Sequence, residues 1–243
     1  MSLTNEKRIQ KNHIVLMKHP QTSLFAGIMM LGDTEVRDGV PTAYTDGVNK
    51  VYGSAFIKDM PDAKLRGLIL HENLHVAFKH LTNGREMFDE NHKLANMAAD
   101  YVVNAVIHDL DGVTPTNEPI ATLPDNALYD KMFTSWSMRQ VYNYLKKQQQ
   151  DQDKDKDKDQ GEEKQGQGQG GGQQGQGEGQ DQPSQGQGQG QRGTLNVNGK
   201  DVPMDSLDEH DFKEPASAEE AKQFEQTVDR ALRQGGITAG RLG

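Results

Sequence analysis

The sequence predicts an α+β protein in which a small antiparallel or mixed sheet packs on a helix, followed by a disordered linker and a short helical tail. Three observations predict this class: helical periodicity recurs in the first 147 residues, two strand-like runs surround a tight-turn signal, and the composition changes abruptly at Gln148. We therefore expect a domain over residues 1–147, a Gln/Gly-rich linker over 148–193 and a tail over 194–243.

Apolar spacing and end signals place the expected elements of the first part. Helices are expected over Thr4–His19, Ala63 to about Leu81, Asn91–Asp109 and Ser135–Lys147. Strands are expected over Ser23–Leu31, Thr42–Thr45 and Lys50–Ser54. The last two strands surround Asp46-Gly47-Val48-Asn49, and Asp-Gly is typical of hairpin turns because it tolerates a positive φ.

The linker and the tail differ sharply in composition. Between Gln148 and Gly193 there is no aliphatic, aromatic, methionine or cysteine side chain, and not even an alanine. Such a segment cannot bury enough apolar area to offset its ordering entropy, so we expect a flexible tether. The tail begins a helix at the capping-box signal Ser217-Ala218-Glu219-Glu220, and this helix is expected to end near Gln234, before Gly235-Gly236. The tail is too poor in apolar residues to fold alone, so we expect it to dock on the N-terminal domain or on a protein partner.

The composition excludes several classes of protein. A formal net charge of −9 argues against a broad nucleic-acid-binding surface. The chain has no Cys, so any metal site must use His, Asp or Glu. No stretch approaches the length of an apolar membrane span, and the N-terminus lacks a hydrophobic signal region. We expect a cytoplasmic protein that binds neither nucleic acid nor a membrane.

The motif His71-Glu72-Asn73-Leu74-His75 carries the chemistry of the chain. It reads H-E-x-x-H and lies inside a predicted helix. Residues four positions apart lie on the same face of a helix, and their side chains start about 6 Å from each other. Two imidazoles so placed can bind one zinc ion through bonds of roughly 2.0–2.1 Å. Glu72 can stay off the metal and act as the base for a water molecule held there. The alternative interpretation is a pair of surface histidines on an amphipathic helix.

A hydrolytic zinc site needs three protein ligands and one open position. His80 is the nearest candidate for the third ligand. On an unbroken helix, however, a residue nine positions after His71 points to the opposite side. We therefore expect His80 to interact with the dipole at the helix C-terminus instead.

The next helix offers a better third ligand. Asn96, Asp100 and Asn104 are spaced four apart, so they form a polar stripe on an otherwise apolar helix. A buried carboxylate needs a cation, so we assign Asp100 as the third ligand. His92 is the runner-up and Glu90 a weaker candidate, while the alternative for Asp100 is an ion pair with Arg or Lys. The two Asn residues are expected to bond backbone groups or to support the ligands.

Three separated blocks of the sequence resemble a family of metallopeptidase domains: Thr42–Gly47, His71–Val76 and Asn96–Asn104. The blocks occur in the same order, and the resemblance covers roughly residues 5–147. It implies a zincin-like fold in which His71 and His75 are metal ligands and Glu72 is the catalytic base, while Asp100 matches the acidic position of the third block. Members of that family occur in bacteria and phages and commonly precede a von Willebrand factor A-like domain, whereas this sequence ends at Gly243, before any such segment.

The sequence therefore predicts a zinc-dependent metallohydrolase, most simply a metallopeptidase acting on a peptide or protein substrate. Imidazole-rich sites suit zinc, although manganese and cobalt stay open. The strand Thr42–Thr45 could pair with an extended peptide, and Tyr44 or Tyr101 could assist the oxyanion. The rival prediction is a non-catalytic metal-binding scaffold that recruits a protein partner through the linker and the tail.

Overall fold

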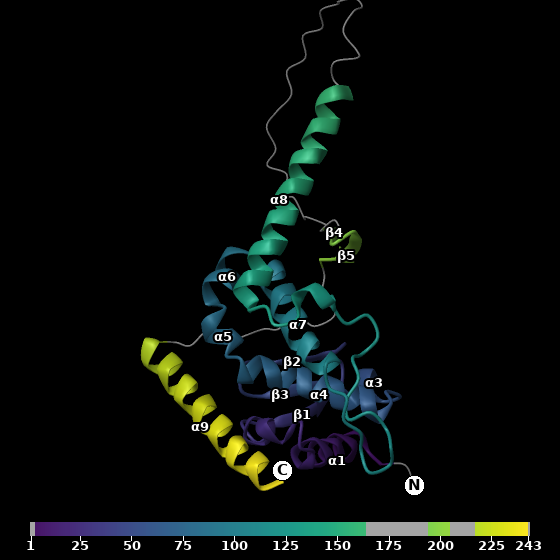
Figure 1. The fold of residues 1–243 in the computed structure, drawn as a ribbon, viewed down its shortest axis with the longest axis vertical. Helices are drawn as coiled ribbons and strands as arrows, with labels where there is room; N and C mark the ends of the chain where they lie inside the picture. The colour runs from purple at the N-terminus through teal and green to yellow at the C-terminus, as the bar shows by residue number, and fades with distance from the viewer. Residues whose placement is uncertain (1–2, 164–193, 205–216, 243) are drawn as a thin grey trace, which may run out of the picture. The chain divides into compact units, whose positions relative to one another are not determined.

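A computed structural model describes residues 3–163, 194–204 and 217–242 of the chain (Figure 1). The chain divides into two compact units: Met1–Asn143 together with Ser206–Gly243, and Tyr144–Asp205. Most of the predicted linker, residues 164–193, lies outside the described residues. Among the helices that are described, none combines the length and apolar character needed to cross a membrane.

The first unit contains most of the helices and the main sheet. In chain order, its elements are α1 (Asn5–Lys18), η1 (Ser23–Phe25), α2 (Ala26–Met29), β1 (Thr34–Arg37), β2 (Ala43–Thr45), β3 (Lys50–Gly53), α3 (Ser54–Ile57), α4 (Asp62–Ala77), α5 (His80–Asn83), α6 (Arg85–Glu90), α7 (His92–His108), η2 (Lys131–Phe133), the start of α8 (Met138–Glu163), and α9 (Ala218–Leu242). The second unit contains the rest of α8 and the hairpin β4 (Thr194–Val197) and β5 (Lys200–Pro203). Helices combined with small sheets confirm the α+β class.

The main sheet has the strand order β1-β3-β2, with β1 parallel and β2 antiparallel to β3. The predicted hairpin between β2 and β3 is confirmed: Gly47 has a φ of 99°, and Asp46 Oδ1 accepts the N–H groups of Val48 and Asn49. One face of the sheet packs on α4. Ala43 of β2 and Tyr52 of β3 pair in register, and both belong to the same buried core as several leucines of α4.

The prediction of a strand over Ser23–Leu31 is wrong, because this run forms the short helices η1 and α2. Periodicity cannot separate a buried strand from a buried helical segment over so few residues. The buried side chain of Lys50 stabilises the end of this helical segment, because its Nζ donates hydrogen bonds to the backbone carbonyls of Ile28 at 3.1 Å and Leu31 at 2.7 Å. The third strand is β1, which the sequence did not predict; three of its four residues are exposed, so it lacks an apolar signal.

Helix α4 is buried on every side from residue 65 to residue 77. Such a helix needs a partner for each polar group that it buries. The guanidinium of Arg66 donates to the carbonyls of Ile120 at 2.6 Å and Pro119 at 2.9 Å, and to Asn12 Oδ1 at 3.0 Å. These bonds join residues 119–120 and helix α1 to α4, the helix that carries the motif.

Helix α4 is shorter at its C-terminus than the sequence predicts. It ends at Ala77 instead of near Leu81, because Lys79 adopts a left-handed φ of 57°. The chain then turns into α5 at His80. The predicted left-handed cap at Thr82-Asn83-Gly84 is wrong, since Gly84 has a φ of −93° and continues the helical path.

The helix predicted at Asn91–Asp109 is confirmed as α7, whose Asn91 side chain accepts the N–H of Leu94 as an N-terminal cap. The helix predicted over Ser135–Lys147 is present as α8, but it begins three residues later, at Met138, and continues to Glu163, so the first residues of the expected flexible tether are helical. The described part of the alternating Asp/Lys run is thus helical, with Lys154 Nζ 3.8 Å from Asp151 Oδ1 one turn earlier.

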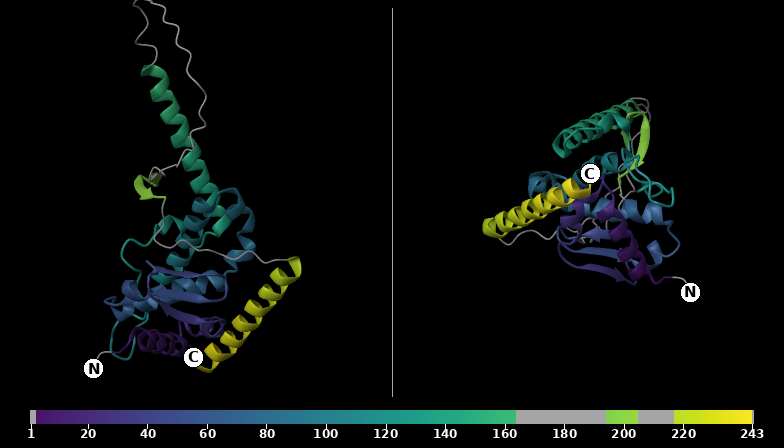
Figure 2. Two further views of the ribbon diagram at one scale, coloured as in Figure 1. Left: turned by 180° about the vertical axis from the view of Figure 1, so that it is seen from behind. Right: turned by 60° about the horizontal axis from the view of Figure 1, so that its bottom comes forward.

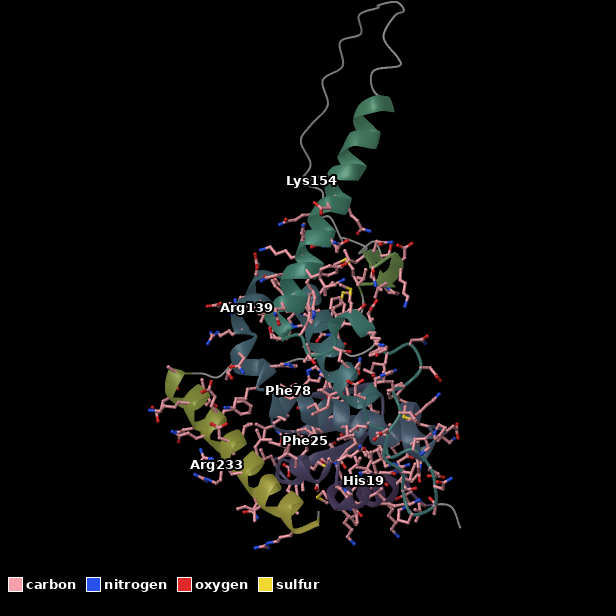
Figure 3. The ribbon with its side chains drawn as sticks, in the orientation of Figure 1. His19, Phe25, Phe78, Arg139, Lys154 and Arg233 are labelled. Carbon is pink, nitrogen blue, oxygen red and sulfur yellow. The ribbon has the colours of Figure 1, made fainter. Side chains whose placement is uncertain are left out.

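The tail helix α9 is part of the first unit, where it docks beside η1 and α2 (Figures 1 and 2). Its buried residues share one apolar cluster with α2 and the end of α4; the cluster comprises Ile28, Val76, Ala77, Val228 and Ala231. Phe25 and Phe78, both labelled in Figure 3, pack against this cluster. Docking on the N-terminal domain is one of the two outcomes that we expected for the tail.

The start of α9 matches the prediction, but its end does not. Ser217 Oγ accepts the N–H of Glu220 at 3.2 Å, as a capping residue should. The helix continues to Leu242 instead of ending near Gln234. Gly235 is a packing residue and not a terminator, because a Cβ at this position would overlap the backbone carbonyl of Leu24.

Candidate metal centre

Helices α4 and α7 bring His71, His75 and Asp100 together in the buried interior of the first unit. One ligand atom from each residue lies within 4.8 Å of the others, a group that could hold a metal ion. The two His Nε2 atoms are 3.1 Å apart, and Asp100 Oδ1 lies 3.6 Å from His71 Nε2 and 3.4 Å from His75 Nε2. The helical repeat places the two imidazoles on one face of α4, and α7 supplies the carboxylate.

The spacing of these three atoms fits a tetrahedral metal ion. In a tetrahedral zinc site with bonds of about 2.0–2.1 Å, neighbouring ligand atoms are about 3.3–3.4 Å apart. The three separations, 3.1, 3.4 and 3.6 Å, bracket that value. His71, His75 and Asp100 would hold such an ion as its three protein ligands, which leaves the fourth position of a tetrahedral site open for water. The donor set of two imidazoles and one carboxylate also suits a divalent transition metal.

Asn104 orients the ring of His71. Its Oδ1 lies 2.9 Å from His71 Nδ1, while its Nδ2 donates to the carbonyl of Leu128 at 2.9 Å. Because the Leu128 carbonyl can only accept, the amide oxygen of Asn104 must face the imidazole. The proton of His71 is therefore on Nδ1, and the lone pair of Nε2 points to the triangle. This contact fulfils the expectation that the polar stripe supports the ligands.

His80 lies on the other side of the site, where the sequence did not place it. Its Nδ1 is 3.0 Å from Nδ1 of His75, and the two ring centroids are 5.0 Å apart with an interplanar angle of 74°. The side chain is buried, with a residue exposure of 3%. The expectation that His80 points away from the site and interacts with the dipole at the C-terminus of this helix is therefore wrong. It assumed an unbroken helix, whereas the left-handed turn at Lys79 folds His80 back toward His75.

Glu72 is fully buried on α4. Burial raises the pKa of the Tyr52 phenol well above its usual range, and the negative charge of Glu72 raises it further. Burial lowers the pKa of Lys50 to about 8, although Asp46 and Glu72 act in the opposite direction. Both effects indicate that the Glu72 carboxylate interacts electrostatically with two residues of β3.

The remaining candidate residues lie outside the triangle. His92 is exposed at the start of α7 and is near the ring of Phe88. Glu90 accepts a hydrogen bond from the hydroxyl of Tyr142 at 2.9 Å. Tyr44 accepts one from Arg37 at 2.9 Å, and Tyr101 packs its ring against Phe133. None of these contacts gives the four residues a part in the metal centre.

The comparison with family models agrees with this geometry. A model described as "Putative metallopeptidase domain" matches residues 4–242. The chain belongs to this family. No curated protein and no solved structure matched the chain. The matched region begins before α1 and includes the whole of α9. The docked C-terminal helix of this chain therefore belongs to the part that the metallopeptidase-domain model covers.

Proposed function

We propose that the chain is a zinc-dependent metallopeptidase with a zincin-like active site, in which His71, His75 and Asp100 are the ligands. The triangle of ligand atoms, at separations of 3.1–3.6 Å, carries this proposal. Three protein ligands with an open fourth position are typical of hydrolytic zinc sites. Membership of the family supports peptide or protein as the substrate class.

Glu72 is the residue of this chain that we assign to proton transfer. When bound, zinc would polarise the scissile carbonyl and lower the pKa of water. Glu72 accepts the proton that the attacking water loses and then delivers it to the nitrogen of the leaving amine. Asn104 keeps Nε2 of His71 directed at the ligand triangle throughout. Each of these residues lies on one of the two packed helices, α4 and α7.

Substrate entry requires a movement. The residue exposures of His71, His75 and Asp100 are 4%, 1% and 4%. Strand β2 forms one edge of the sheet, as a peptide-pairing strand should, but Ala43 and Thr45 are fully buried. A substrate peptide can therefore reach β2 and the three ligands only after part of the surrounding structure moves.

The same burial supports the rival function, a metal-binding scaffold. Structural zinc sites are closed to solvent, whereas catalytic sites keep access to an open position. A scaffold would keep the ligand triangle and use the linker and the tail to recruit a protein partner. It would, however, gain nothing from burying the Glu72 carboxylate on the turn that carries the ligands, since burying a charge is costly.

The test measures metal content and hydrolysis together on the full chain. Zinc-loaded protein is analysed for zinc per chain and incubated with a diverse peptide library, whose cleavage is followed by mass spectrometry. We expect Glu72→Gln to keep its zinc and to lose hydrolysis, and Asp100→Ala to lose both. His92→Ala is the matched control, because this exposed histidine on the same helix as Asp100 should affect neither. Wild-type protein that holds one zinc but cleaves no peptide would favour the scaffold, and protein that binds no zinc would refute both functions.

A further inference from the structure

The second imidazole contact, between His75 and His80, has no place in the ligand triangle. Nδ1 of His80 does not face the triangle, because it lies 3.0 Å from Nδ1 of His75. The triangle uses the opposite nitrogen of His75, Nε2. His80 therefore stands directly behind a ligand, on the side away from the metal position.

The tautomers of the two rings follow from this arrangement. For Nε2 of His75 to present a lone pair to a metal, its proton must be on Nδ1. That Nδ1–H then donates to Nδ1 of His80, which accepts, so the proton of His80 is on its own Nε2. His71 makes the same type of contact through its Nδ1, with Asn104 Oδ1 at 2.9 Å. Each imidazole of the triangle thus has one buried acceptor behind it.

We propose that His80 is the positioning residue of His75: it fixes the tautomer and the ring orientation of this ligand, and it thereby sets the metal affinity of the site. This inference rests on the proposed metal-binding function. Its physical basis is that a metal-bound imidazole is held by the partner of its other ring nitrogen, and losing such a partner typically reduces metal affinity by about 10–100-fold.

The surrounding structure holds His80 in this position. The left-handed turn at Lys79 reverses the chain, and Lys79 Nζ forms an ion pair with Asp229 of α9 at 2.7 Å. The ring of Phe78 is tilted against His80 at a centroid distance of 5.8 Å, and Phe78 also packs on the cluster that includes α9. The acceptor behind His75 is therefore fixed by the docked C-terminal helix as well as by its own turn.

Two substitutions separate the acceptor from the bulk of the side chain. In His80→Asn, Oδ1 can take the place of Nδ1 and accept from His75. In His80→Leu, the volume is similar but no acceptor is present. The zinc affinity of each full-length protein is measured by competition with a chromophoric chelator, alongside the melting temperature of the metal-free protein. A third variant, His80→Gln, moves the amide one methylene further out and serves if His80→Leu does not fold.

We expect His80→Asn to keep the wild-type zinc affinity within about threefold, and His80→Leu or His80→Gln to lose about 10–100-fold. Wild-type affinity in His80→Leu would overturn the inference, and so would equal losses in His80→Asn and His80→Leu, which would indicate a purely structural role. If the wild-type protein binds no zinc, the metal-binding function itself fails, and with it the inference; that result is read from the wild-type arm alone. The readout needs no hydrolysis, so a scaffold with a metal site would give the same expected pattern.

Discussion

Two neighbouring glycines of α9 provide a sharp test of how this helix docks. Gly235 is buried, and a Cβ there would overlap the backbone carbonyl of Leu24. Gly236 is exposed, and its Cβ would meet only Leu24 Cδ1, at 3.9 Å. Replacing either glycine by alanine gives the same intrinsic helical gain, about 1 kcal/mol. The two variants differ only in what the added methyl group touches.

The expected energies follow from that difference. Gly236→Ala should stabilise the protein by up to about 1 kcal/mol. Gly235→Ala makes the same gain but forces a backbone overlap, and overpacking typically costs about 1–3 kcal/mol. The variants should therefore differ in stability by about 1–3 kcal/mol, with Gly235→Ala the less stable. For a unit of this size, each kcal/mol shifts the melting temperature by about 2–4 °C.

Thermal unfolding of the full chain in excess chelator, followed by circular dichroism, measures the difference without a contribution from metal binding. Limited proteolysis of the same proteins reports whether α9 has left its surface, since undocked helices are cleaved more readily. If Gly235→Ala raises the melting temperature as much as Gly236→Ala does, the close approach between Leu24 and Gly235 is wrong, and so is the docking of α9 through this face.

Two further outcomes test the interior of the first unit. Asn104→Ala removes the acceptor behind His71 and should reduce zinc affinity by about 10–100-fold in chelator competition; an unchanged affinity would show that the ring needs no such support. Burial, with a smaller effect of Lys50, lowers the pKa of His13 from 6.5 to about 4. Between pH 4 and pH 6.5, the unfolded chain therefore binds more protons at His13 than the folded chain does. The stability that His13 contributes is complete above pH 6.5 and is lost as the pH falls toward 4. Urea unfolding at pH 7 and pH 5 should show a loss of about 2 kcal/mol in the wild type that His13→Leu lacks, and equal losses in both proteins would contradict this assignment.

The grouping of His71, His75 and Asp100 could be predicted from sequence because each step rests on local geometry or on a strong energetic rule. The period of the helix puts His71 and His75 on one face whatever the rest of the fold does. Asp100 followed from the cost of burying a carboxylate in an apolar helix. Neither step needs the tertiary structure, and the structure brings the three side chains together.

The elements that could not be predicted depend on contacts between distant parts of the chain. Ser23–Leu31 has the apolar content of a strand, but it is helical, and the side chain of Lys50 donates hydrogen bonds to two of its backbone carbonyls. Gly235 is a residue type that often ends a helix, yet α9 continues past it. Because Gly235 has no side chain, the backbone of Leu24 can pack directly against it. In both cases a residue far away in the sequence decides between two conformations that the local pattern allows.

His80 shows how such a distant contact changes a functional interpretation. On an ideal helix, residues 71 and 80 point in opposite directions. The helix is interrupted at Lys79, a residue type with no special preference for a left-handed φ. Such a conformation costs free energy, and it persists only where the surroundings stabilise it. Here Lys79 is paired with Asp229, a residue of the C-terminal helix that follows the Gln/Gly-rich segment. The acceptor behind His75 thus depends on a helix that no local pattern connects to the motif. Metal affinity and the docking of α9 should consequently be coupled, so Gly235→Ala should weaken zinc binding while Gly236→Ala leaves it unchanged.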